Sequence, residues 1–433
     1  MGRPSRLPGT AKIDQIVCHV DADCFYAACE RLREPALRGE PLVVGMGYEP
    51  GTDSGAVATA SYEARAYGVE SAQAISEALE QLPRKIDAAS RDDLDVAAAG
   101  FYRPVDMEFY ESVAADVKAV LHEWADTVRE VSVDEAYLDV TEQTSWDEVE
   151  EFASSLKAEI QERVGIVVSV GVAPTMSAAK VASDHDKPDG LVVVPPESVS
   201  DFLAPLDVEA VHGVGPVTAD ALREQGIETA GDLAAADPAV LERSFGQRGR
   251  RMYRFARGED SRSVEPRGQP KSFSRESAFT EPTADREKQR QRVRTLASAV
   301  AQRAARRGVL YQTIGIKAVT PPFDVTTRER TLPGPAGDEA LVERLALSLF
   351  EEFEGQQIRK LGVRVANLSF GSETQSQLQV WANEGQKTTS DKSDSRNDTH
   401  RQNECDEREC EHNHEHEHEH ERDAGQRTLS EFE

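Results

Sequence analysis

The sequence predicts a multidomain α+β protein, and three observations support this fold class. Strand-like and helix-like segments alternate over residues 16–173 in the order of a split βαβ sheet. After about residue 195 the pattern changes to short helical segments, and residues 271–370 again mix strands with helices. Beyond Phe370, polar and charged repeats replace the apolar periodicity, and we expect this tail to be disordered because it cannot bury enough apolar surface.

The first elements follow from short apolar runs and their breaks. IVCHV, residues 16–20, predicts a strand, and FYAACERLREP, residues 25–35, predicts a helix that a proline stops. PLVVG, residues 41–45, predicts a second strand. Residues 53–69 are rich in small residues and glycine, so we expect a compact loop that leads into a helix.

Two amphipathic helices and a hairpin complete the predicted sheet. Residues 107–125 and 146–164 place apolar residues at helical spacing, and GIVVSVGVA, residues 165–173, predicts a strand. Between the helices lies VREVSVDEAYLDV, residues 128–140, where apolar residues alternate. The resulting order of strand, helix, strand, strand, helix, strand indicates a split βαβ sheet, with residues 25–91 inserted after its first strand.

Two adjacent acids, Asp134 and Glu135, interrupt this alternation. On one continuous strand their side chains would point to opposite faces, and one carboxylate would be buried at high cost. A tight hairpin with both acids at the connection places them instead at an exposed sheet end, beside Asp21 at the end of the first strand. Three carboxylates there predict a two-metal site for phosphoryl transfer, with Mg²⁺ favoured by hard oxygen ligands. A solvated turn is the alternative for any single acid.

The segment after residue 195 has features of a phosphate-binding unit. Residues 211–227 contain a turn with Gly213 and Gly215 followed by a helix, whose N-terminal N–H groups can bind phosphate. A run of arginines follows, and its place beside the turn favours contact with a nucleic-acid backbone over a solvated helix face. These arginines are Arg248, Arg250, Arg251, Arg254 and Arg257.

A linker then leads to a further α/β unit. SVEPRGQPKSFS, residues 263–274, lacks periodicity, and strands are expected at residues 313–320 and 359–370. The net charge of −28 hides an uneven distribution, because residues 265–372 hold 18 basic and 13 acidic residues whereas residues 371–433 hold 7 and 17. Basic charge is therefore concentrated in the unit after the linker.

Composition also bears on the environment of the protein. The basic residues comprise 38 Arg and only 12 Lys, and an acidic, lysine-poor chain is typical of a protein kept soluble in very high salt, although an ordinary acidic cytosolic protein is the alternative. No apolar run approaches the roughly 20 residues that span a bilayer, and the N-terminal residues lack the apolar core of a signal peptide. Five cysteines in two groups do not form a disulfide framework, so we expect a cytoplasmic location.

Five segments together resemble the successive motifs of Y-family DNA polymerases, and they are closest to the polymerase IV type of archaea and bacteria. They read VDADCFYAACE, DSGAVATASYEAR, VSVDEAYLDV, SVGVAPTMSAAKVASDHDKPDG and VHGVGPVTADAL, and the resemblance extends from Ile16 to Phe370. It implies a right-hand polymerase with a ferredoxin-like palm. The implied domains are a catalytic palm at 1–24 and 92–194, fingers at 25–91, a helix-hairpin-helix thumb at 195–262, a linker at 263–270, a little finger at 271–371, a disordered tail at 372–425 and a terminal peptide at 426–433.

The resemblance also implies roles for individual residues. Asp21, Asp134 and Glu135 would be catalytic and would bind two Mg²⁺ ions, with the backbone carbonyl of Ala22 as a further ligand. Tyr26 would be the steric gate that excludes a 2′-hydroxyl. Contacts to the nucleotide triphosphate would come from Thr59, Tyr62, Arg65 and Lys187, whereas Lys180 is a weaker candidate for which a surface or DNA-backbone role is equally expected. DNA contacts would come from Gly213, Gly215, Arg248, Arg250, Arg251, Lys271 and Arg275.

The function implied is a template-directed, low-fidelity translesion polymerase, acting as a monomer on primer-template DNA and deoxynucleoside triphosphates. The small residues at 55–58 would leave space over the nascent base pair. Two alternatives belong to other classes: a non-catalytic scaffold that binds DNA and a sliding clamp, and a nucleotidyl cyclase, which also carries paired acids on a split βαβ sheet. The retained acids argue against the scaffold, and the glycine hairpin has no use in a cyclase.

The tail carries two further motifs. QRTLSEF, with Gln426, Leu429 and Phe432, resembles a sliding-clamp-binding peptide, and a flexible linker of this length reaches roughly 40 Å. Four possible zinc ligands precede it in a repetitive setting whose spacing fits no compact zinc finger, so a polar spacer that binds metals loosely is the alternative. These ligands are Cys405, Cys410, His412 and His414.

Overall fold

The structure is a computed structural model that describes residues 15–91 and 93–370. It divides into two compact units, which we call the first and the second unit, with the division between Gln269 and Pro270. The division falls within the predicted linker, where residues 259–270 form no helix or strand. In the part of the chain that the structure describes, no helix has the length and apolar character that a membrane crossing requires.

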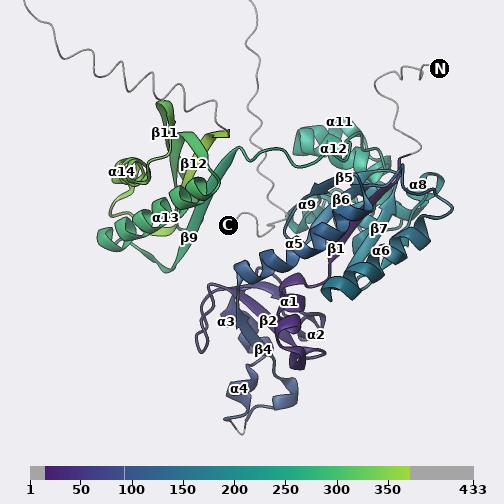
Figure 1. The fold of residues 1–433 in the computed structure, drawn as a ribbon, viewed down its shortest axis with the longest axis horizontal. Coiled ribbons are helices and arrows are strands. Elements are labelled where there is room, and N and C mark those ends of the chain that lie inside the picture. The colour runs from purple at the N-terminus through teal and green to yellow at the C-terminus, as the bar shows by residue number, and fades with distance from the viewer. Residues whose placement is uncertain (1–14, 92, 371–433) are drawn as a thin grey trace, which may run out of the picture. The chain divides into compact units, whose positions relative to one another are not determined.

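The first unit is built on a five-stranded sheet with the order β5-β6-β1-β7-β8 (Figure 1). Strand β1 lies at the centre and pairs antiparallel with both β6 and β7. This arrangement confirms the predicted split βαβ sheet, to which β8 adds a parallel edge beside β7. The strands are β1 (Val17–Ala22), β5 (Thr127–Glu130), β6 (Glu135–Asp139), β7 (Val168–Ala173) and β8 (Leu191–Val193).

The two faces of this sheet are covered by different helices. Helices α5 (Met107–Trp124) and α6 (Val149–Val164), both predicted, pack on the face that carries Cys18 and Val20. Helix α7 (Met176–His185) packs on the opposite face. Because side chains alternate along a strand, the residues of β1 between these apolar positions point toward α7.

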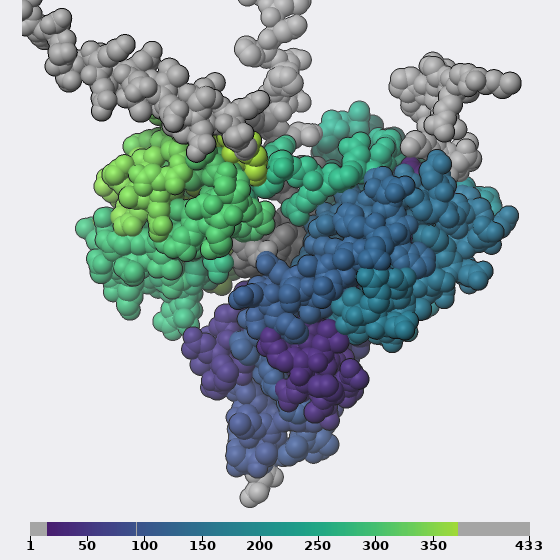
Figure 2. Space-filling view, in the orientation of Figure 1, coloured from purple at the N-terminus to yellow at the C-terminus, as the bar shows by residue number. Residues whose placement is uncertain are grey.

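The inserted segment forms a second, three-stranded sheet with the order β3-β2-β4, and in Figure 2 it is a lobe coloured purple to blue. Strand β3 forms within residues 53–69, where we predicted a loop. Strand β4 pairs with β2, so the sheet extends beyond the boundary predicted at residue 91. The elements are α1 (Phe25–Arg33), η1 (Pro35–Leu37), β2 (Leu42–Met46), β3 (Ala56–Ala60), α2 (Tyr62–Arg65), α3 (Ile75–Gln81), α4 (Lys85–Ala88), η2 (Val96–Ala98) and β4 (Phe101–Pro104).

Short helices follow β8, as predicted. Most of them enclose a small core of their own that includes Leu222, Leu241 and Phe255. Helix α8 differs, because its Val199 and Leu203 belong to the core beneath α7. The elements are η3 (Pro196–Ser198), α8 (Val199–Leu203), η4 (Val208–Ala210), α9 (Pro216–Arg223), α10 (Ala230–Ala235), α11 (Pro238–Phe245) and α12 (Gln247–Ala256).

The second unit is a four-stranded antiparallel sheet, β11-β10-β12-β9, packed against two helices. Both strands predicted in this region are confirmed as parts of β10 and β12. Strand β11 has mostly exposed side chains, which explains why no apolar pattern revealed it. The elements are β9 (Ser272–Thr283), α13 (Arg286–Arg306), β10 (Val309–Thr320), β11 (Asp324–Ala336), α14 (Glu339–Phe350), η5 (Glu351–Phe353) and β12 (Ile358–Phe370).

Candidate active site

The predicted hairpin is present, but its connection differs from the prediction. Strands β5 and β6 pair antiparallel, and the connection comprises residues 131–134, so that Glu135 opens β6 and only Asp134 lies in the turn. The Ser132 hydroxyl accepts hydrogen bonds from the backbone N–H groups of Asp134 (3.3 Å) and Glu135 (3.1 Å). The turn thus separates the two adjacent acids into different environments.

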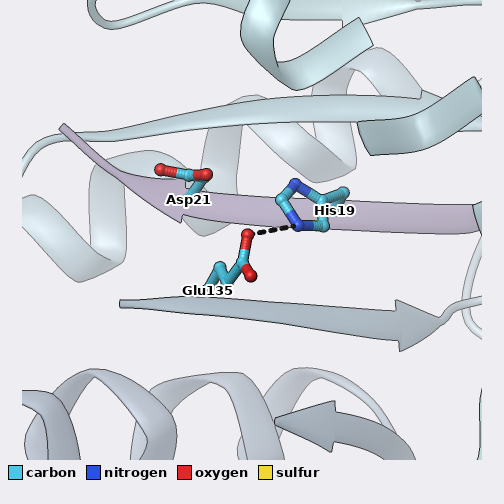
Figure 3. Close-up of side chains that lie close together, drawn as sticks. All are labelled: His19, Asp21 and Glu135. Carbon is cyan, nitrogen blue, oxygen red and sulfur yellow. Dashed lines mark ion pairs between the residues drawn. The ribbon is translucent and has the colours of Figure 1, made fainter. Parts of the chain in front are cut away.

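Asp21 and Glu135 are brought together by strand register. They are directly paired across β1 and β6, so their side chains share the face that α7 covers. Figure 3 shows these two carboxylates with His19, which lies two residues before Asp21 on the same face. One ligand atom from each of the three residues lies within 4.8 Å of the others. We call Asp21 and Glu135 the acid pair.

Helix α7 and the segment that follows it each supply one lysine to the acid pair, Lys180 and Lys187. The Lys180 ammonium lies 2.7 Å from Asp21 Oδ2 and 3.0 Å from Glu135 Oε2, and the Lys187 ammonium lies 2.8 Å from Asp21 Oδ1. The close approach of α7 depends on Gly171 in β7, where a β-carbon would lie 2.1 Å from the carbonyl oxygen of Ala179. Lys180 is therefore part of the site, and with only 12% of its side chain exposed it is not a surface lysine.

The electrostatics of the acid pair favour ionised carboxylates. Burial alone would raise the pKa of Asp21, but the ammonium groups of Lys180 and Lys187 outweigh it and hold the pKa below its ordinary value. The pKa of Glu135 is also lowered, because its contacts with His19 and Lys180 outweigh burial. The same attraction raises the pKa of Lys180 against the effect of its own burial. Two carboxylates and one ammonium are thus all charged at neutral pH.

Asp134 stands apart from the acid pair. Its carboxylate accepts a 2.5 Å hydrogen bond from the Ser132 hydroxyl, and it is not among the three residues whose ligand atoms converge within 4.8 Å. Its backbone carbonyl accepts a hydrogen bond from the Ala22 N–H at 3.0 Å, which ties the turn to the end of β1. Burial raises the pKa of Asp134, and the charges of Asp21 and Glu135 raise it further. The acid is therefore within electrostatic reach of the pair.

Two functional residues were missed by the sequence analysis. His19 is fully buried, with Nδ1 2.8 Å from the Ser183 hydroxyl and Nε2 3.4 Å from Glu135 Oε2. Asp23 accepts hydrogen bonds from the Tyr62 hydroxyl (3.0 Å) and from the backbone N–H of Asp189 (2.8 Å). A signal for His19 was available, since strand alternation places residue 19 on the face of residue 21.

The predicted nucleotide-binding residues lie in two places. Tyr62 and Arg65 belong to the short helix α2, where the Arg65 guanidinium lies over the Tyr62 ring at 5.0 Å and donates to the Ala60 carbonyl at 3.0 Å. Thr59 precedes them on β3. Lys187 lies instead at the acid pair. Asp23, which follows β1, connects the two places. Its carboxylate accepts hydrogen bonds from the Tyr62 hydroxyl and from the backbone N–H of Asp189, two residues after Lys187.

Tyr26, the predicted steric gate, is buried in the first turn of α1. Its ring stacks on Tyr110 of α5 with centroids 4.7 Å apart and an interplanar angle of 19°. The ring position is thus fixed by packing between the inserted segment and the sheet-covering helix.

The predicted DNA-binding residues lie in both units, and all of them except the buried Gly215 are exposed or half-buried. In the first unit, Arg248 donates a 3.0 Å hydrogen bond to the Gly213 carbonyl, which places the start of the arginine run beside the glycine turn, as predicted. Arg250 pairs with Glu242 at 2.6 Å. Gly215 caps α9, Arg251 lies on α12, and Lys271 and Arg275 are exposed at the start of the second unit. The tail residues, including Gln426, Leu429, Phe432 and the Cys405 to His414 motif, lie outside the described residues.

The acid pair has the donor chemistry of a divalent-cation site. Carboxylate oxygens are hard ligands that suit Mg²⁺, and two strands hold them at a fixed separation. A cation already fits between them, because the Lys180 ammonium contacts both carboxylates. The residues present therefore fit a divalent ion bound by Asp21 and Glu135, with Asp134 within electrostatic reach.

Comparisons with known sequences and structures agree with this site and fold. The model of the impB/mucB/samB family matches residues 20–184, the C-terminal domain of that family matches residues 270–380, and the thumb domain of DNA polymerase-iota matches residues 210–260. Among solved structures, a Y-family DNA polymerase chimera of Dbh and Dpo4 aligns with a TM-score of 0.70 and 30% identity, and DinB from Sulfolobus solfataricus aligns with a TM-score of 0.56 and 30% identity. Each alignment covers 82% of this chain and 100% of the solved chain. The fold is therefore that of a DNA-directed DNA polymerase.

The relatives narrow this class. DNA polymerase IV of Halobacterium salinarum is 62% identical over 374 residues, which cover 86% of this chain and 90% of that protein. DNA polymerase IV of Methanoculleus marisnigri is 39% identical over 84% of this chain and 97% of that protein. The chain belongs to the Y family of DNA polymerases and is of the polymerase IV type of haloarchaea. The predicted family and fold class are confirmed.

Proposed function

We propose that the protein performs template-directed translesion DNA synthesis, adding deoxynucleotides to a primer 3′-hydroxyl by phosphoryl transfer at the acid pair. The observation that carries the proposal is the direct pairing of Asp21 and Glu135 on adjacent strands, with the Lys180 ammonium in contact with both carboxylates. Solved relatives include an insertion ternary complex of Dbh DNA polymerase, which is 29% identical and aligns with a TM-score of 0.58. Primer-template DNA and deoxynucleoside triphosphates are the corresponding substrates here.

The chain contributes to this reaction mainly by positioning charge. Asp21, Glu135 and Asp134 would hold two Mg²⁺ ions, which stabilise the attacking and leaving oxygens of an in-line displacement. Lys187 lies at the acid pair, where a cation can neutralise triphosphate oxygens. Arg65 and Tyr62 are held as a stacked pair, and Thr59 offers a hydroxyl nearby in sequence. Their side chains would orient the triphosphate beside the acids.

Several finer properties belong to the same proposal. The stacked Tyr26 ring would exclude a ribose 2′-hydroxyl, and the small residues at 55–58 would tolerate damaged template bases at the expense of fidelity. The glycine turn, the arginine run and the basic second unit would follow the DNA backbone. We also propose a cytoplasmic monomer that is tethered to a sliding clamp by Gln426, Leu429 and Phe432.

Primer extension in high-salt buffer tests the enzyme against the scaffold and the cyclase. Wild-type protein should extend a primer, whereas Asp134→Ala and Glu135→Ala should not. The matched control is Glu130→Gln, since Glu130 lies on β5 of the same hairpin and pairs with Lys118 rather than with the acid pair. A wild-type protein that fails to extend at any salt concentration would favour the scaffold, and cyclic nucleotide formation without DNA would favour the cyclase.

Sugar selection tests the steric gate separately. Tyr26→Ala should admit ribonucleotides, because the ring that would lie against the 2′-hydroxyl is removed. Tyr26→Phe, which keeps the ring and its stacking on Tyr110, is the control and should retain selection for deoxynucleotides. Unchanged selection in Tyr26→Ala would remove this assignment.

A further inference from the structure

Lys180 has an unusual set of partners. Its ammonium contacts Asp21 at 2.7 Å, Glu135 at 3.0 Å and, more distantly, Asp184 at 3.4 Å. Only 12% of its side chain is exposed, whereas 45% of the Asp184 side chain is exposed. The contacts of Lys180 with the acid pair are thus buried, whereas Asp184, one helical turn further along α7, is open to solvent.

The ammonium and a divalent ion compete for the same oxygens. A metal held by Asp21 and Glu135 would accept a lone pair from each carboxylate, and the Lys180 ammonium donates its hydrogen bonds to Asp21 Oδ2 and Glu135 Oε2. Placing a second positive charge within a few ångströms of the ammonium in a buried site would also be strongly unfavourable. The Lys180 ammonium and a divalent ion therefore cannot occupy the space between the two acids at the same time.

We propose that Lys180 is a resident competitor for the catalytic metal. Its ammonium neutralises the acid pair while no divalent ion is bound, and it moves toward Asp184 when an ion binds. This inference rests on the metal site of the proposed function. It assigns to Lys180 control of metal affinity, which is distinct from contact with a triphosphate or with DNA.

The structure provides a destination for the displaced side chain. A cavity of about 260 Å³ adjoins Lys180 and is lined by Asp184, Glu209 and His212 among others. Asp184 can replace the lost contacts, because its carboxylate is already within 3.4 Å of the ammonium. Burial and the neighbouring Arg262 lower the pKa of His212 to about 4, so the imidazole adds no positive charge to oppose the arriving ammonium at neutral pH.

The competition has a measurable consequence for metal affinity. If the ammonium occupies the site in about nine molecules of ten, the apparent dissociation constant for the metal is raised about tenfold over that of the open site. Removing the ammonium should therefore tighten metal binding in the absence of DNA and nucleotide. Among the residues that the structure describes, it should also leave Asp21 with Lys187 alone and Glu135 with no ammonium contact, so that Mn²⁺ raises the melting temperature of the variant more than that of the wild type.

The test is a Mn²⁺ titration of the full-length protein without DNA or nucleotide, followed by the electron paramagnetic resonance signal of free Mn²⁺. Lys180→Met should lower the dissociation constant about tenfold, and Lys180→Arg should leave it within about twofold. Lys157→Met is the charge-matched control, because the Lys157 ammonium contacts the carbonyl oxygens of Val168, Asp189 and Gly190 instead of the acid pair. It should also leave the dissociation constant within about twofold.

The outcomes separate this inference from the proposed function. Asp21→Asn should abolish the tight Mn²⁺ site, and if it does not, the metal site itself is misassigned. If wild-type binding requires Asp21 but Lys180→Met binds no more tightly, the competition is overturned and the metal site stands. Should Lys180→Met fail to fold, a crystal structure of wild-type protein with Mn²⁺ decides. The ammonium should then have left both Asp21 and Glu135, and retention of both contacts beside a bound ion would refute the proposal.

Discussion

The two units of the protein contain the same local arrangement in different surroundings. In the first unit, Asp21 is held between Lys180 and Lys187; in the second, Glu276 on β9 is held between Lys317 at 2.9 Å and Lys360 at 2.5 Å. The exposed fractions of the two carboxylate side chains are nearly equal, at 12% and 14%. A largely buried carboxylate held by two lysines is therefore not by itself evidence of a catalytic site.

The difference lies in the other charged groups near each carboxylate and its two lysines, an arrangement that we call the first clamp at Asp21 and the second clamp at Glu276. Asp21 is paired with Glu135 and lies near Asp134, so three acids face the two ammonium groups, and Asp184 adds a fourth acid. Glu276 contacts two lysines, and its cross-strand partner is Gly362. The excess of buried carboxylates around Asp21 requires a cation in addition to the two lysines. The charge of Glu276, in contrast, is already neutralised by Lys317 and Lys360. We attribute metal binding to the first clamp for this reason, and a structural role to the second.

The largest expected effect is on catalysis. Glu135→Gln should lower the rate of nucleotide incorporation about a thousandfold, because a metal ligand worth several kcal/mol of transition-state stabilisation is lost. Glu276→Gln, the matched change in the second unit, should leave the rate within about threefold when DNA is saturating. Single-turnover primer extension measures both. A comparable loss in the two variants would abolish the distinction between the clamps.

The second expected effect is on packing, and it compares the glycines that face each clamp. Gly171→Ala would place a β-carbon 2.1 Å from the Ala179 carbonyl oxygen, so α7 must shift, and we expect the first unit to lose about 3 kcal/mol of unfolding free energy. At Gly362 the nearest atom, at 2.8 Å, belongs to the Glu276 side chain, which can move, and Gly362→Ala should cost less than about 1 kcal/mol. Urea-dependent hydrogen exchange, resolved by peptide, measures each unit separately. Equal losses of unfolding free energy in the two variants would show that the packing of α7 does not depend on Gly171.

A smaller effect separates the acids within the first clamp. The raised pKa of Asp134 means that the folded protein holds this proton more tightly than the unfolded chain, so stability falls as pH rises through the shifted value. At neutral pH without metal, Asp134→Asn should therefore raise the melting temperature by about 2–4 °C while abolishing catalysis. A lower melting temperature would show that the Asp134 charge is stabilised by contacts other than those described.

The smallest effect is on acid stability, and here the two clamps should behave alike. Glu135 and Glu276 both have a pKa lowered from 4.5, so each contributes stability that is fully present above that pH and is lost as pH falls through the folded value. The Gln variant of either residue should therefore flatten the decline of melting temperature below pH 4.5. The change should be smaller for Glu276, since its lysines are more exposed and solvent screens the pair. A larger change for Glu276 would contradict this ranking.

The sequence was informative where a chemical requirement left a local pattern. The paired acids, the strand ending near Asp21 and the glycine turn at Gly213 could be predicted, because strand alternation and turn chemistry are short-range properties. Strand β3 was missed, since its alanines and glycine neighbour give no apolar alternation, and β11 was missed because its side chains are mostly exposed. Such strands are held by cross-strand pairing that no local window reveals.

The lysine contacts required three-dimensional information. Lys180 lies 159 residues from Asp21, and no local pattern distinguishes it from a surface lysine on an amphipathic helix. Its role depends on Gly171, which lets the helix approach the sheet. His19 could have been found by alternation alone, but a buried histidine on a strand is more often a core residue than a partner of catalytic acids.

The most direct test of the acid pair as the metal site is to locate the metal in a complex of the protein with primer-template DNA, a nucleotide and unreactive Ca²⁺. We predict Ca²⁺ at roughly 2.3–2.6 Å from carboxylate oxygens of Asp21 and Glu135 in a crystal structure, with none bound to Glu276. Ca²⁺ bound elsewhere, with Asp21 and Glu135 still joined only through Lys180, would contradict the assignment.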